Sequence, residues 1–242
     1  MEILPGIIAD HTALWFEKYK ILCLADLHLG YDEELYRKGV HVPTNEWQYQ
    51  RNLISKLMAK YKPKIVLLNG DVKHGFSGIN DREWRHTVKL FDLISEHAQL
   101  VLIKGNHDNI LEPIARTRKI VIENQFIAGD ILFMHGDILP EKEVLKNIKT
   151  VVIGHEHPSV NLSRGVRSEQ YKCFLALPWN KRTLIVQPST FSLTIGADIA
   201  NNPQFGPFLK KTEDAIVYVV GEDGVVLNFG SLSALPIQKK EK

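Results

Sequence analysis

The chain has 242 residues, of which 44% are hydrophobic and 24% are charged, and its formal net charge at pH 7 is +2. These values are typical of an ordinary globular protein and exclude a collagen-like, low-complexity or strongly charged disordered chain. They also exclude the strong positive charge by which many nucleic-acid-binding domains are recognised. No apolar run is long enough to cross a bilayer, so we expect no membrane association.

The cellular compartment is indicated by the N-terminus and by the cysteines. Residues 1–12 lack the basic region and the long apolar core of a signal peptide. The two cysteines, Cys23 and Cys173, lie far apart in the sequence and form no C-x-x-C motif. This arrangement suits a reducing compartment and gives neither a disulfide framework nor a zinc site. We therefore expect a cytoplasmic protein.

The first half of the chain alternates apolar runs with segments of helical periodicity. The segments expected to be strands are 2–8, 12–16, 21–25, 65–69 and 100–103. Residues 44–61 carry apolar side chains at helical spacing, with Thr44 as the expected N-cap and Pro63 just after the end. Residues 81–97 repeat the pattern, with Asp81 as the cap. Because helices and apolar strands alternate, we expect strand–helix–strand units and a parallel sheet.

After residue 118 the pattern changes to short strands separated by turns. The expected strands are 119–122, 125–128, 131–135, 150–153, 171–177, 183–187, 215–220 and 225–229. They predict a second, more antiparallel sheet packed on the first. The stretch 196–212 is turn-rich and weakly patterned, so we expect a loop there. We assign residues 1–237 to a single domain and expect the charged tail, 238–242, to be disordered.

Six of the ten histidines fall in five short motifs, three of which also contain Asp or Asn. In chain order the motifs are Asp26-Leu27-His28, Gly70-Asp71-Val72-Lys73-His74, Gly105-Asn106-His107-Asp108, His135-Gly136 and Gly154-His155-Glu156-His157. Each motif follows an apolar run that is expected to be a buried strand. Oxygen ligands and imidazoles at the ends of parallel strands are the groups that a pair of divalent metal ions requires. The sequence therefore predicts a metal centre at the edge of the sheets.

The motif order D-x-H, GD, GNH[DE], H and GH-x-H resembles the signature of the calcineurin-like metallophosphoesterase superfamily. The resemblance spans residues 26–157. It implies an α/β fold, a four-layer αββα sandwich with mixed sheets, which would account for both halves of the chain. It also implies a metal-dependent phosphoesterase, in which a metal-bound hydroxide attacks phosphorus in line with the leaving oxygen.

Carried over residue by residue, the resemblance assigns seven metal ligands and two divalent ions per chain. One ion would be held by Asp26, His28, Asp71 and His157, and the other by Asp71, Asn106, His135 and His155. This mixture of oxygen and nitrogen ligands favours Mn²⁺, with Fe and Zn²⁺ as alternatives. Two divalent ions, two carboxylates and a hydroxide leave a net charge of about +1, which attracts phosphate and stabilises negative charge in the transition state.

Two further histidines are candidates for a catalytic role. The resemblance implies that His107 stabilises the transition state or protonates the leaving oxygen, and a structural hydrogen bond is the alternative. Asp108 is expected to hold the loop that presents Asn106 and His107. His74 stands where protein Ser/Thr phosphatases have an aspartate, as in the SbcD-type nucleases of double-strand-break repair. Because an imidazole can contact a phosphodiester backbone that a carboxylate would repel, His74 favours a diester or nucleic-acid substrate.

Longer segments resemble narrower groups within the superfamily. Residues 25–43, 154–160 and 184–199 are similar to small SbcD-related archaeal phosphoesterases and to PdeM, the ligase-associated DNA damage response endonuclease family. This resemblance implies a nuclease that acts on DNA or RNA and has DNA-repair partners. Large SbcD-type nucleases carry a DNA-binding capping region after GH-x-H, whereas only residues 158–242 follow here. We therefore expect the substrate site to come from loops of the core.

Alternative functions remain open. The same site could act on small molecules, as a cyclic-nucleotide phosphodiesterase, a phosphomonoesterase or a nucleotide hydrolase. A metal-binding scaffold for protein interaction is disfavoured because every ligand position is intact. Residues 141–182 contain eight Lys or Arg against four Glu, an excess that either faces a polyanionic substrate or belongs to a solvated surface. Residues 179–182 predict a hairpin turn whose Trp179 either packs on the body or stacks on nucleic acid.

Overall fold

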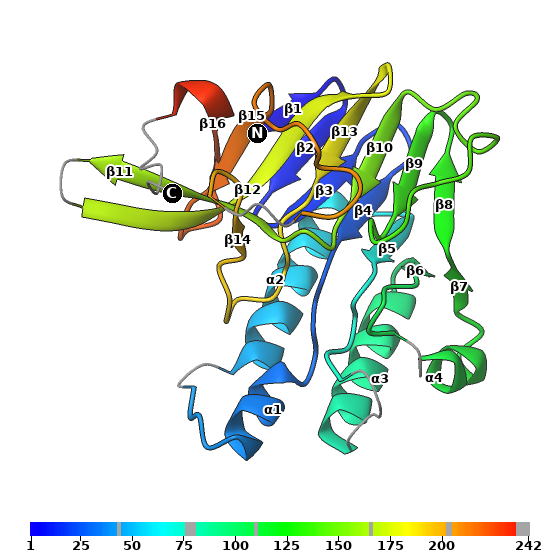
Figure 1. Ribbon diagram of the computed structural model, residues 1–242. Coiled ribbons are helices and arrows are strands. Elements are labelled where there is room, and N and C mark those ends of the chain that lie inside the picture. The colour runs from blue at the N-terminus through cyan, green and yellow to red at the C-terminus, as the bar shows by residue number, and fades with distance from the viewer. Residues whose placement is uncertain (43–44, 76–80, 109–110, 165–166, 202–204, 236–242) are drawn as a thin grey trace.

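Two stacked mixed β-sheets form the centre of the computed structural model, and helices cover the outer face of the first sheet (Figure 1). The structure describes residues 1–42, 45–75, 81–108, 111–164, 167–201 and 205–235. The predicted α/β class with mixed sheets is confirmed by this arrangement. The expected tail, 238–242, lies outside the described residues, and the assignment of 1–237 to one domain stays a prediction.

The first sheet has seven strands that lie side by side in sequence order. They are β1 (Glu2–Leu4), β2 (Ile7–Asp10), β3 (Ala13–Phe16), β4 (Ile21–Leu24), β5 (Ile65–Asn69), β6 (Gln99–Ile103) and β7 (Val121–Glu123). Strands β1 to β4 pair antiparallel, and β4 to β7 pair in parallel, as expected from the helical connections. The prediction of a single strand over 2–8 was wrong. Gly6, at a φ of 74°, turns the chain there and divides the segment into β1 and β2.

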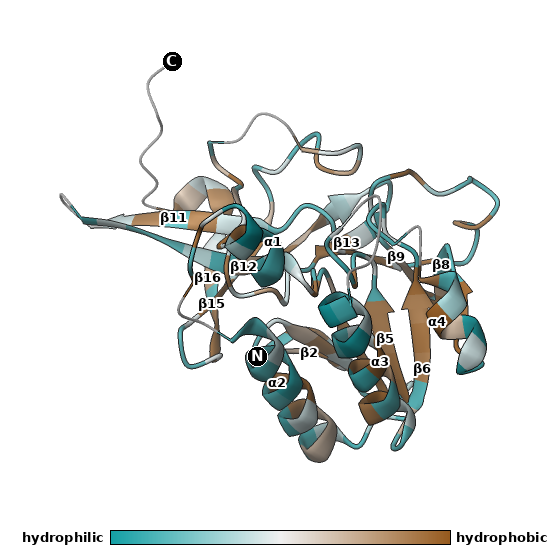
Figure 2. Cartoon of the chain, turned by 90° about the horizontal axis from the view of Figure 1, so that it is seen from below, coloured by the Kyte–Doolittle hydropathy of each residue, from teal (hydrophilic) through white to brown (hydrophobic). Residues whose placement is uncertain are grey.

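Four helices accompany this sheet in the described part of the chain. They are α1 (Tyr31–Arg37), α2 (Glu46–Tyr61), α3 (Asp81–Ser95) and α4 (Glu112–Thr117). The apolar faces of α2 and α3, with Leu53, Leu57 and Phe91 among their buried residues, pack in one core with Leu22 and Leu68 of the sheet. Figure 2 shows β5 and β6 as almost uniformly hydrophobic strands beneath helices of mixed hydropathy, which is the pattern of a sheet buried on both faces.

The ends of α2 and α3 differ slightly from the prediction. The N-cap of α2 is Asn45, whose side chain accepts a hydrogen bond of 3.2 Å from the backbone N–H of Gln48. The expected cap, Thr44, lies outside the described residues. Lys62 ends α2 in the left-handed conformation just before Pro63. Asp81 is the first residue of α3 rather than a residue preceding it, and the helix ends at Ser95.

The second sheet contains the remaining strands. They are β8 (Gln125–Ala128), β9 (Ile131–Met134), β10 (Thr150–Ile153), β11 (Pro158–Arg164), β12 (Arg167–Trp179), β13 (Arg182–Val186), β14 (Ala197–Asp198), β15 (Ile216–Val220) and β16 (Val226–Ser231). Their main order is β14-β11-β12-β13-β10-β9-β8, and β15 and β16 extend from β12. The central strand β10 is parallel to both β9 and β13. Its end therefore points to the same edge as theirs.

Two strands of the second sheet were not predicted. Strand β11 and the first residues of β12 form a hairpin that projects from the body (Figure 1), and much of this hairpin is solvent-accessible and polar. Apart from Val160 and Leu162, it therefore lacks the apolar alternation by which strands are recognised. The short strand β14 lies inside the stretch 196–212, which is otherwise irregular as expected. The turn between β12 and β13 is confirmed, and Trp179 packs against Phe208 with ring centroids 5.0 Å apart.

The core is divided into three layers by the two sheets. Between the sheets, Phe16 and Phe133 meet edge to face at 4.8 Å, beside the buried Cys23 and Phe174. In the described part of the chain, the outer face of the second sheet is covered by turns and by a short 3₁₀ helix, Leu232–Ala234. None of the helices in the described residues is both long and apolar enough to cross a membrane.

Candidate metal centre

All five motifs meet at one edge of the stacked sheets. Asp26 and His28 follow β4, Asp71 follows β5 and Asn106 follows β6 of the first sheet. His135 follows β9 of the second sheet, and His155 and His157 follow β10. The structure thus brings together all seven side chains that the sequence assigned as metal ligands.

The first cluster in this centre consists of Asp26, His28 and His157, whose ligand atoms all lie within 4.8 Å of one another. The Nε2 atoms of His28 and His157 are 3.3 Å apart. The Nε2 atom of His157 lies 3.5 Å from Oδ1 of Asp26. One carboxylate oxygen and two imidazole nitrogens therefore converge on a common point.

The second cluster consists of Asp71, His135 and His155, again with ligand atoms within 4.8 Å of one another. The Nε2 atom of His135 lies 3.5 Å from Oδ2 of Asp71 and 3.1 Å from Nδ1 of His155. The amide oxygen of Asn106 lies 3.0 Å from the same His135 Nε2 atom, which places Asn106 at this cluster.

Asp71 lies between the two clusters. Its Oδ2 atom faces His135 of the second cluster at 3.5 Å and His28 of the first at 3.9 Å. Its Oδ1 atom accepts a hydrogen bond of 3.0 Å from the backbone N–H of His107, which fixes the carboxylate plane. A single oxygen that faces both clusters is the arrangement expected of a ligand shared by two cations.

The chemistry of the donors fits divalent cations. Asp26 Oδ1 is buried and, among the described residues, makes no hydrogen bond. Burial of an unpaired carboxylate oxygen costs free energy, and a bound cation would offset this cost. Facing imidazole nitrogens at 3.1–3.3 Å present lone pairs to one another unless a proton or a cation lies between them. Carboxylate, amide and imidazole together suit Mn²⁺, Fe or Zn²⁺.

The pKa shifts of the side chains in the centre also indicate a site for cations. Burial raises the pKa of Asp71 well above its usual range, and the negative charge of the neighbouring Asp26 raises it further. Burial lowers the pKa of His28 to about 2 and also lowers that of His155. These imidazoles are therefore neutral at pH 7, which is the form that binds metals. Two close buried carboxylates ionise together only when cations compensate them.

Five of the seven side chains stand on strained backbone. Asp26, His28, Asp71, His155 and His157 have φ values between 43° and 64°, in the left-handed region that non-glycine residues seldom adopt. Left-handed non-glycine residues cost free energy and concentrate where function requires a particular geometry.

Three of the four glycines in the motifs make room for a ligand of another motif. A Cβ atom on Gly70 would lie closer than 3.0 Å to the His135 ring, and one on Gly105 would overlap the Asp71 carboxylate. A Cβ atom on Gly154 would lie 2.6 Å from Asp26 Oδ2. The G-D, G-N-H and G-H motifs therefore contain glycine because ligands from different strands approach the backbone closely.

Asp108 ties the motif loops of the first sheet together. The carboxylate is buried and accepts hydrogen bonds from the backbone N–H groups of Val72, Lys73 and Gly105 at 3.0, 3.3 and 3.0 Å. The sequence assigned Asp108 to this kind of structural role. Its bonds hold the loop after β5 against the loop after β6, which positions Asp71 beside Asn106.

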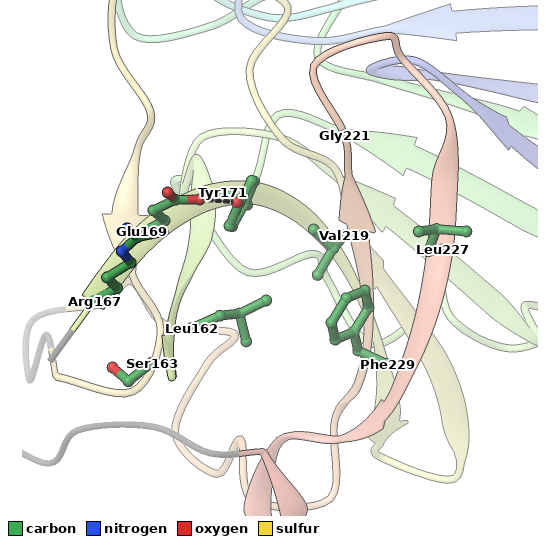
Figure 3. Close-up of a pocket in the computed structure, with 9 residues that line it drawn as sticks. All are labelled: Leu162, Ser163, Arg167, Glu169, Tyr171, Val219, Gly221, Leu227 and Phe229. Carbon is green, nitrogen blue, oxygen red and sulfur yellow. Dashed lines mark hydrogen bonds between the residues drawn. The ribbon is translucent and has the colours of Figure 1, made fainter. Parts of the chain in front are cut away.

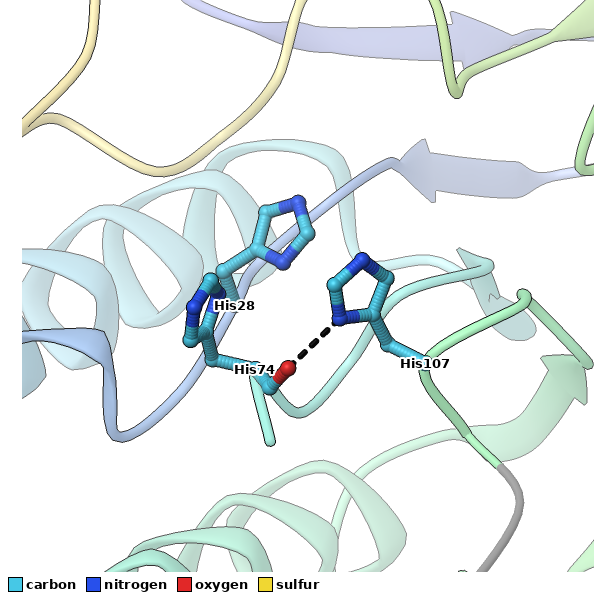
Figure 4. Close-up of side chains that lie close together, drawn as sticks. All are labelled: His28, His74 and His107. Atoms are coloured by element: carbon cyan, nitrogen blue, oxygen red, sulfur yellow. Dashed lines mark hydrogen bonds between the residues drawn. The ribbon is translucent and has the colours of Figure 1, made fainter. Parts of the chain in front are cut away.

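The two histidines predicted to be catalytic lie beside the first cluster, where His28, His74 and His107 form a third group (Figure 4). His107 Nδ1 lies 2.5 Å from the backbone carbonyl oxygen of His74, and its Nε2 lies 3.7 Å from Asp71 Oδ2. The His74 ring lies 4.2 Å from the ring of Tyr31, and its Nε2 is 3.2 Å from a carboxylate oxygen of Glu34. Burial lowers the pKa of His74 to about 4, although Glu34 opposes this.

A loop after β13, Pro188–Ser192, supports the centre from the other side and was not assigned a role from the sequence. Phe191 in this loop lies against His28 and Tyr31, with ring centroids 6.0 and 5.1 Å apart. The segment belongs to the stretch 184–199 that resembles the phosphoesterases, and this similarity was the available signal.

Two charged side chains hold this loop. Lys172 Nζ donates hydrogen bonds of 2.8 Å to both the carbonyl oxygen and the hydroxyl of Ser189, and another to the carbonyl oxygen of Phe191. Glu46 accepts hydrogen bonds from the backbone N–H and the hydroxyl of Ser192. Because both contacts join residues far apart in the sequence, no local pattern indicated them.

Three of the eight basic residues of 141–182 bind other groups of the protein. Lys172 is used inside the molecule, as described above. Arg182 donates to the backbone carbonyl oxygens of Leu145 and Asn180, and Lys149 pairs with Asp130. These partners favour the interpretation of this charge as structural and surface charge.

An Asp, Asn and His centre at the shared edge of two stacked mixed sheets defines a metal-dependent phosphoesterase. Residues 19–186 match the family model of the calcineurin-like phosphoesterases. The chain therefore belongs to this family, as its motifs predicted. Among curated proteins, none matches the chain.

Solved structures share this fold at low sequence identity. The Pseudomonas putida nuclease MPE matches with a TM-score of 0.63 and 18% identity, over 92% of this chain and 94% of the other. Yfce, a phosphoesterase from E. coli, matches with a TM-score of 0.44 and 14% identity, over 86% of this chain and 96% of the other.

Proposed function

We propose that this protein hydrolyses phosphodiester bonds of nucleic acid with the help of two divalent cations. The observation that carries the two-cation proposal is the position of Asp71 Oδ2, which faces both His135 and His28. Asp26, His28 and His157 would hold one cation. Asn106, His135 and His155 would hold the other, and Asp71 would contact both. When bound, the cations supply Lewis acidity and lower the pKa of water at the site.

The chain's own residues would position the reacting groups and move a proton. Water attacks phosphorus in line with the leaving oxygen, and the P–O ester bond breaks on the opposite side. The leaving oxygen then requires a proton. Because His107 Nδ1 donates its proton to the carbonyl oxygen of His74, its Nε2 atom faces the centre. In the imidazolium form of the ring, which carries a proton on both nitrogens, Nε2 would donate that proton.

The preference for a diester rests on His74 and its surroundings. A monoester carries more negative charge than a diester, and an additional cationic side chain at the site would be needed to compensate that difference. Here a largely neutral imidazole, packed on Tyr31, occupies the position beside His107 and His28. The fold neighbour MPE is described as a nuclease, which accords with this proposal.

The metal, the partners and the location follow as parts of the same proposal. We propose Mn²⁺ as the ion because the ligands are mixed oxygen and nitrogen donors. DNA-repair proteins are the proposed partners, by the resemblance to the SbcD-related and PdeM groups. A cytoplasmic location is supported by the two cysteines, Cys23 and Cys173, which are both buried free thiols.

A substrate panel tests the proposed function. Mn²⁺-loaded protein is assayed with bis-p-nitrophenyl phosphate, p-nitrophenyl phosphate, cyclic nucleotides, and single- and double-stranded DNA and RNA. We expect diesters to exceed the monoester in kcat/KM and at least one polynucleotide to be cut. A preference for the monoester, or cleavage of cyclic nucleotides alone, would instead identify a small-molecule phosphoesterase.

A further inference from the structure

Two cavities open beside the metal centre, each lined in part by proposed ligands. The first has a volume of about 550 Å³ and is lined by Asn106 and His135 among other residues. The second has a volume of about 730 Å³ and is lined by His155 and His157. The two cavities share no lining residue. They are therefore separate spaces that meet the centre through different ligands.

The cavities lie toward opposite ends of the second sheet. Gln125 and Met134 of β8 and β9 line the first cavity, and Gln170 and Ala197 of β12 and β14 line the second. Strands β8 and β14 are the two ends of the main strand order of that sheet. The metal centre follows β9 and β10 and so lies between the cavities. A phosphodiester carries two substituents on one phosphorus and would fill both spaces, whereas a monoester would fill one.

The charge of the cavities indicates which part of the substrate they accept. The carboxylates of Asp137 and Glu141 line the first cavity together with one cation, Lys104. Glu156 lines the second, and none of the described residues that line it is Lys or Arg. Surroundings of this kind would not attract a further phosphate. They suit the uncharged nucleoside on either side of the scissile phosphate.

Exposed aliphatic side chains stand at both cavities. Ile138 and Leu139 of the first cavity are 68% and 45% exposed, and Ile195 of the second is 46% exposed. Covering such surface is favourable because it removes apolar area from water. Isoleucine and leucine are among the apolar residues with which nucleic-acid-binding proteins contact the faces of unstacked bases.

We propose that the two cavities bind the two nucleosides that flank the scissile phosphate. Ile138 and Leu139 contact the base on one side, and Ile195 contacts the base on the other. The inference rests on the proposed function and extends it: the smallest full substrate is a dinucleotide. The protein then recognises its substrate by the nucleoside on each side of the scissile phosphate rather than by a long basic groove that binds many phosphates.

The test separates nucleoside binding from chemistry by means of matched substrates. Methyl p-nitrophenyl phosphate and thymidine 5′-(p-nitrophenyl phosphate) have the same leaving group and differ in the nucleoside. Thymidylyl-(3′→5′)-thymidine carries a nucleoside on both sides. These three are assayed with the wild type, with the double variant Ile138→Ala/Leu139→Ala, and with Ile195→Ala.

A control variant comes from a third cavity, of about 410 Å³, that contains none of the proposed metal ligands (Figure 3). Leu227 lines this cavity and is 50% exposed, which is close to the exposure of Leu139 and Ile195. Leu227→Ala removes a similar exposed aliphatic side chain at a cavity away from the centre. We expect it to behave as the wild type on all three substrates.

The expected result is a loss of about tenfold in kcat/KM on the dinucleotide for each cavity variant, mainly through KM. On the thymidine ester, one of the two cavity variants should lose a similar factor in kcat/KM. On the methyl ester, kcat/KM of both cavity variants and of Leu227→Ala should stay within about twofold of the wild type. Unchanged thermal midpoints would show that the variants fold.

Two kinds of failure can be told apart. If the wild type cleaves the methyl ester but neither cleaves the dinucleotide nor prefers the thymidine ester, the proposed nucleic-acid function is overturned, and this inference with it. If the wild type cleaves the dinucleotide and the cavity variants match Leu227→Ala, the inference alone is overturned. The same holds if the variants lose activity equally on the methyl ester.

Discussion

The Nδ1 atom of His107 lies 2.5 Å from the backbone carbonyl oxygen of His74. A carbonyl oxygen only accepts hydrogen bonds, so His107 carries a proton on Nδ1 and presents to the metal centre Nε2, the nitrogen that can take up and release a second proton. The orientation of one histidine thus depends on the backbone of the other, not on its ring. The two side chains can therefore be tested separately.

Replacement of His107 should separate metal binding from chemistry. We expect His107→Gln to keep its bound metals and to lose about 10²- to 10⁴-fold in kcat, the usual contribution of a positioned acid–base group. Elemental analysis and kinetics with bis-p-nitrophenyl phosphate measure the two properties. Loss of metal together with activity would assign His107 a structural role instead.

Replacement of His74 should affect polymeric substrates most. His74→Ala keeps the carbonyl oxygen that orients His107 but removes the ring beside it. We expect a loss of roughly tenfold or more in kcat/KM on an oligonucleotide, and a smaller loss on bis-p-nitrophenyl phosphate, because an activated leaving group needs less positioning. His97→Ala, an exposed histidine outside every motif, is the control. Equal losses on both substrates would argue against a role in positioning the polymer.

Because Asp71 lies between the two clusters, its replacement should affect the binding of both cations. We expect the wild type to bind two divalent ions per chain, and Asp71→Asn to bind fewer and to lose hydrolysis, because the amide cannot supply a negative oxygen to both clusters. Metal content and activity are measured on the same preparations. Asp92→Asn, in an exposed pair with Arg118, should change neither property. Full activity of Asp71→Asn with one bound ion would contradict the two-cation proposal.

Gly105 should tolerate no side chain. A Cβ atom there would overlap the backbone nitrogen and the carboxylate of Asp71, so Gly105→Ala must displace the loop after β5 or β6. We expect at least a tenfold weaker affinity for Mn²⁺, measured by isothermal titration, with a folded circular-dichroism spectrum. In Gly221→Ala, the shortest new contact of the Cβ is 3.1 Å, with the side chain of Asp223, and this variant serves as the control. If Gly105→Ala bound Mn²⁺ as tightly as the wild type, the loops after β5 and β6 would be able to accommodate the added Cβ without disturbing the ligands.

Asp10 should stabilise the fold in a pH-dependent manner, away from the metal centre. Its carboxylate contacts Lys60, Tyr61 and His11 at 2.6–2.7 Å. Burial opposes ionisation, but hydrogen bonds with these three groups outweigh it and lower the pKa of Asp10 to about 2, from 3.8. A depressed folded-state pKa gives stability that is present above pH 3.8 and is lost as the pH falls toward 2.

The corresponding variant is Asp10→Asn. We expect it to lower the free energy of unfolding by about 1–2 kcal/mol at pH 7, and the difference from the wild type to shrink below about pH 4. Urea denaturation across this pH range measures both quantities. Asp130→Asn, which removes an exposed carboxylate paired with Lys149, is the control and should change stability much less than Asp10→Asn does, because the pair is exposed to solvent. A constant deficit for Asp10→Asn down to pH 2 would exclude an electrostatic origin.

Local patterns predicted those parts of the molecule in which the signal lies within a few residues. The apolar runs before Asp26, Asp71 and Asn106 predicted the strands that carry them, and parallel strands end at a common edge for reasons of geometry. Strand β11 gave no such signal, because Val160 and Leu162 are its only large apolar residues and two residues are too short a pattern to recognise. The turn at Gly6, which divides 2–8 into β1 and β2, was not predicted because a turn of two residues barely interrupts the apolar pattern of the segment.

The sequence by itself determined the fold class, the family and which side chains would meet at the edge of the sheets. The resemblance had already assigned Asp71 to both ions. Only the tertiary structure decided that Lys172 and Glu46 hold the loop bearing Phe191, and that cavities flank the centre on two sides. These features join residues up to about 150 positions apart, and they depend on how two sheets stack and where their loops pack. Such contacts are set by the summed packing of the whole core, which no local pattern of residues encodes.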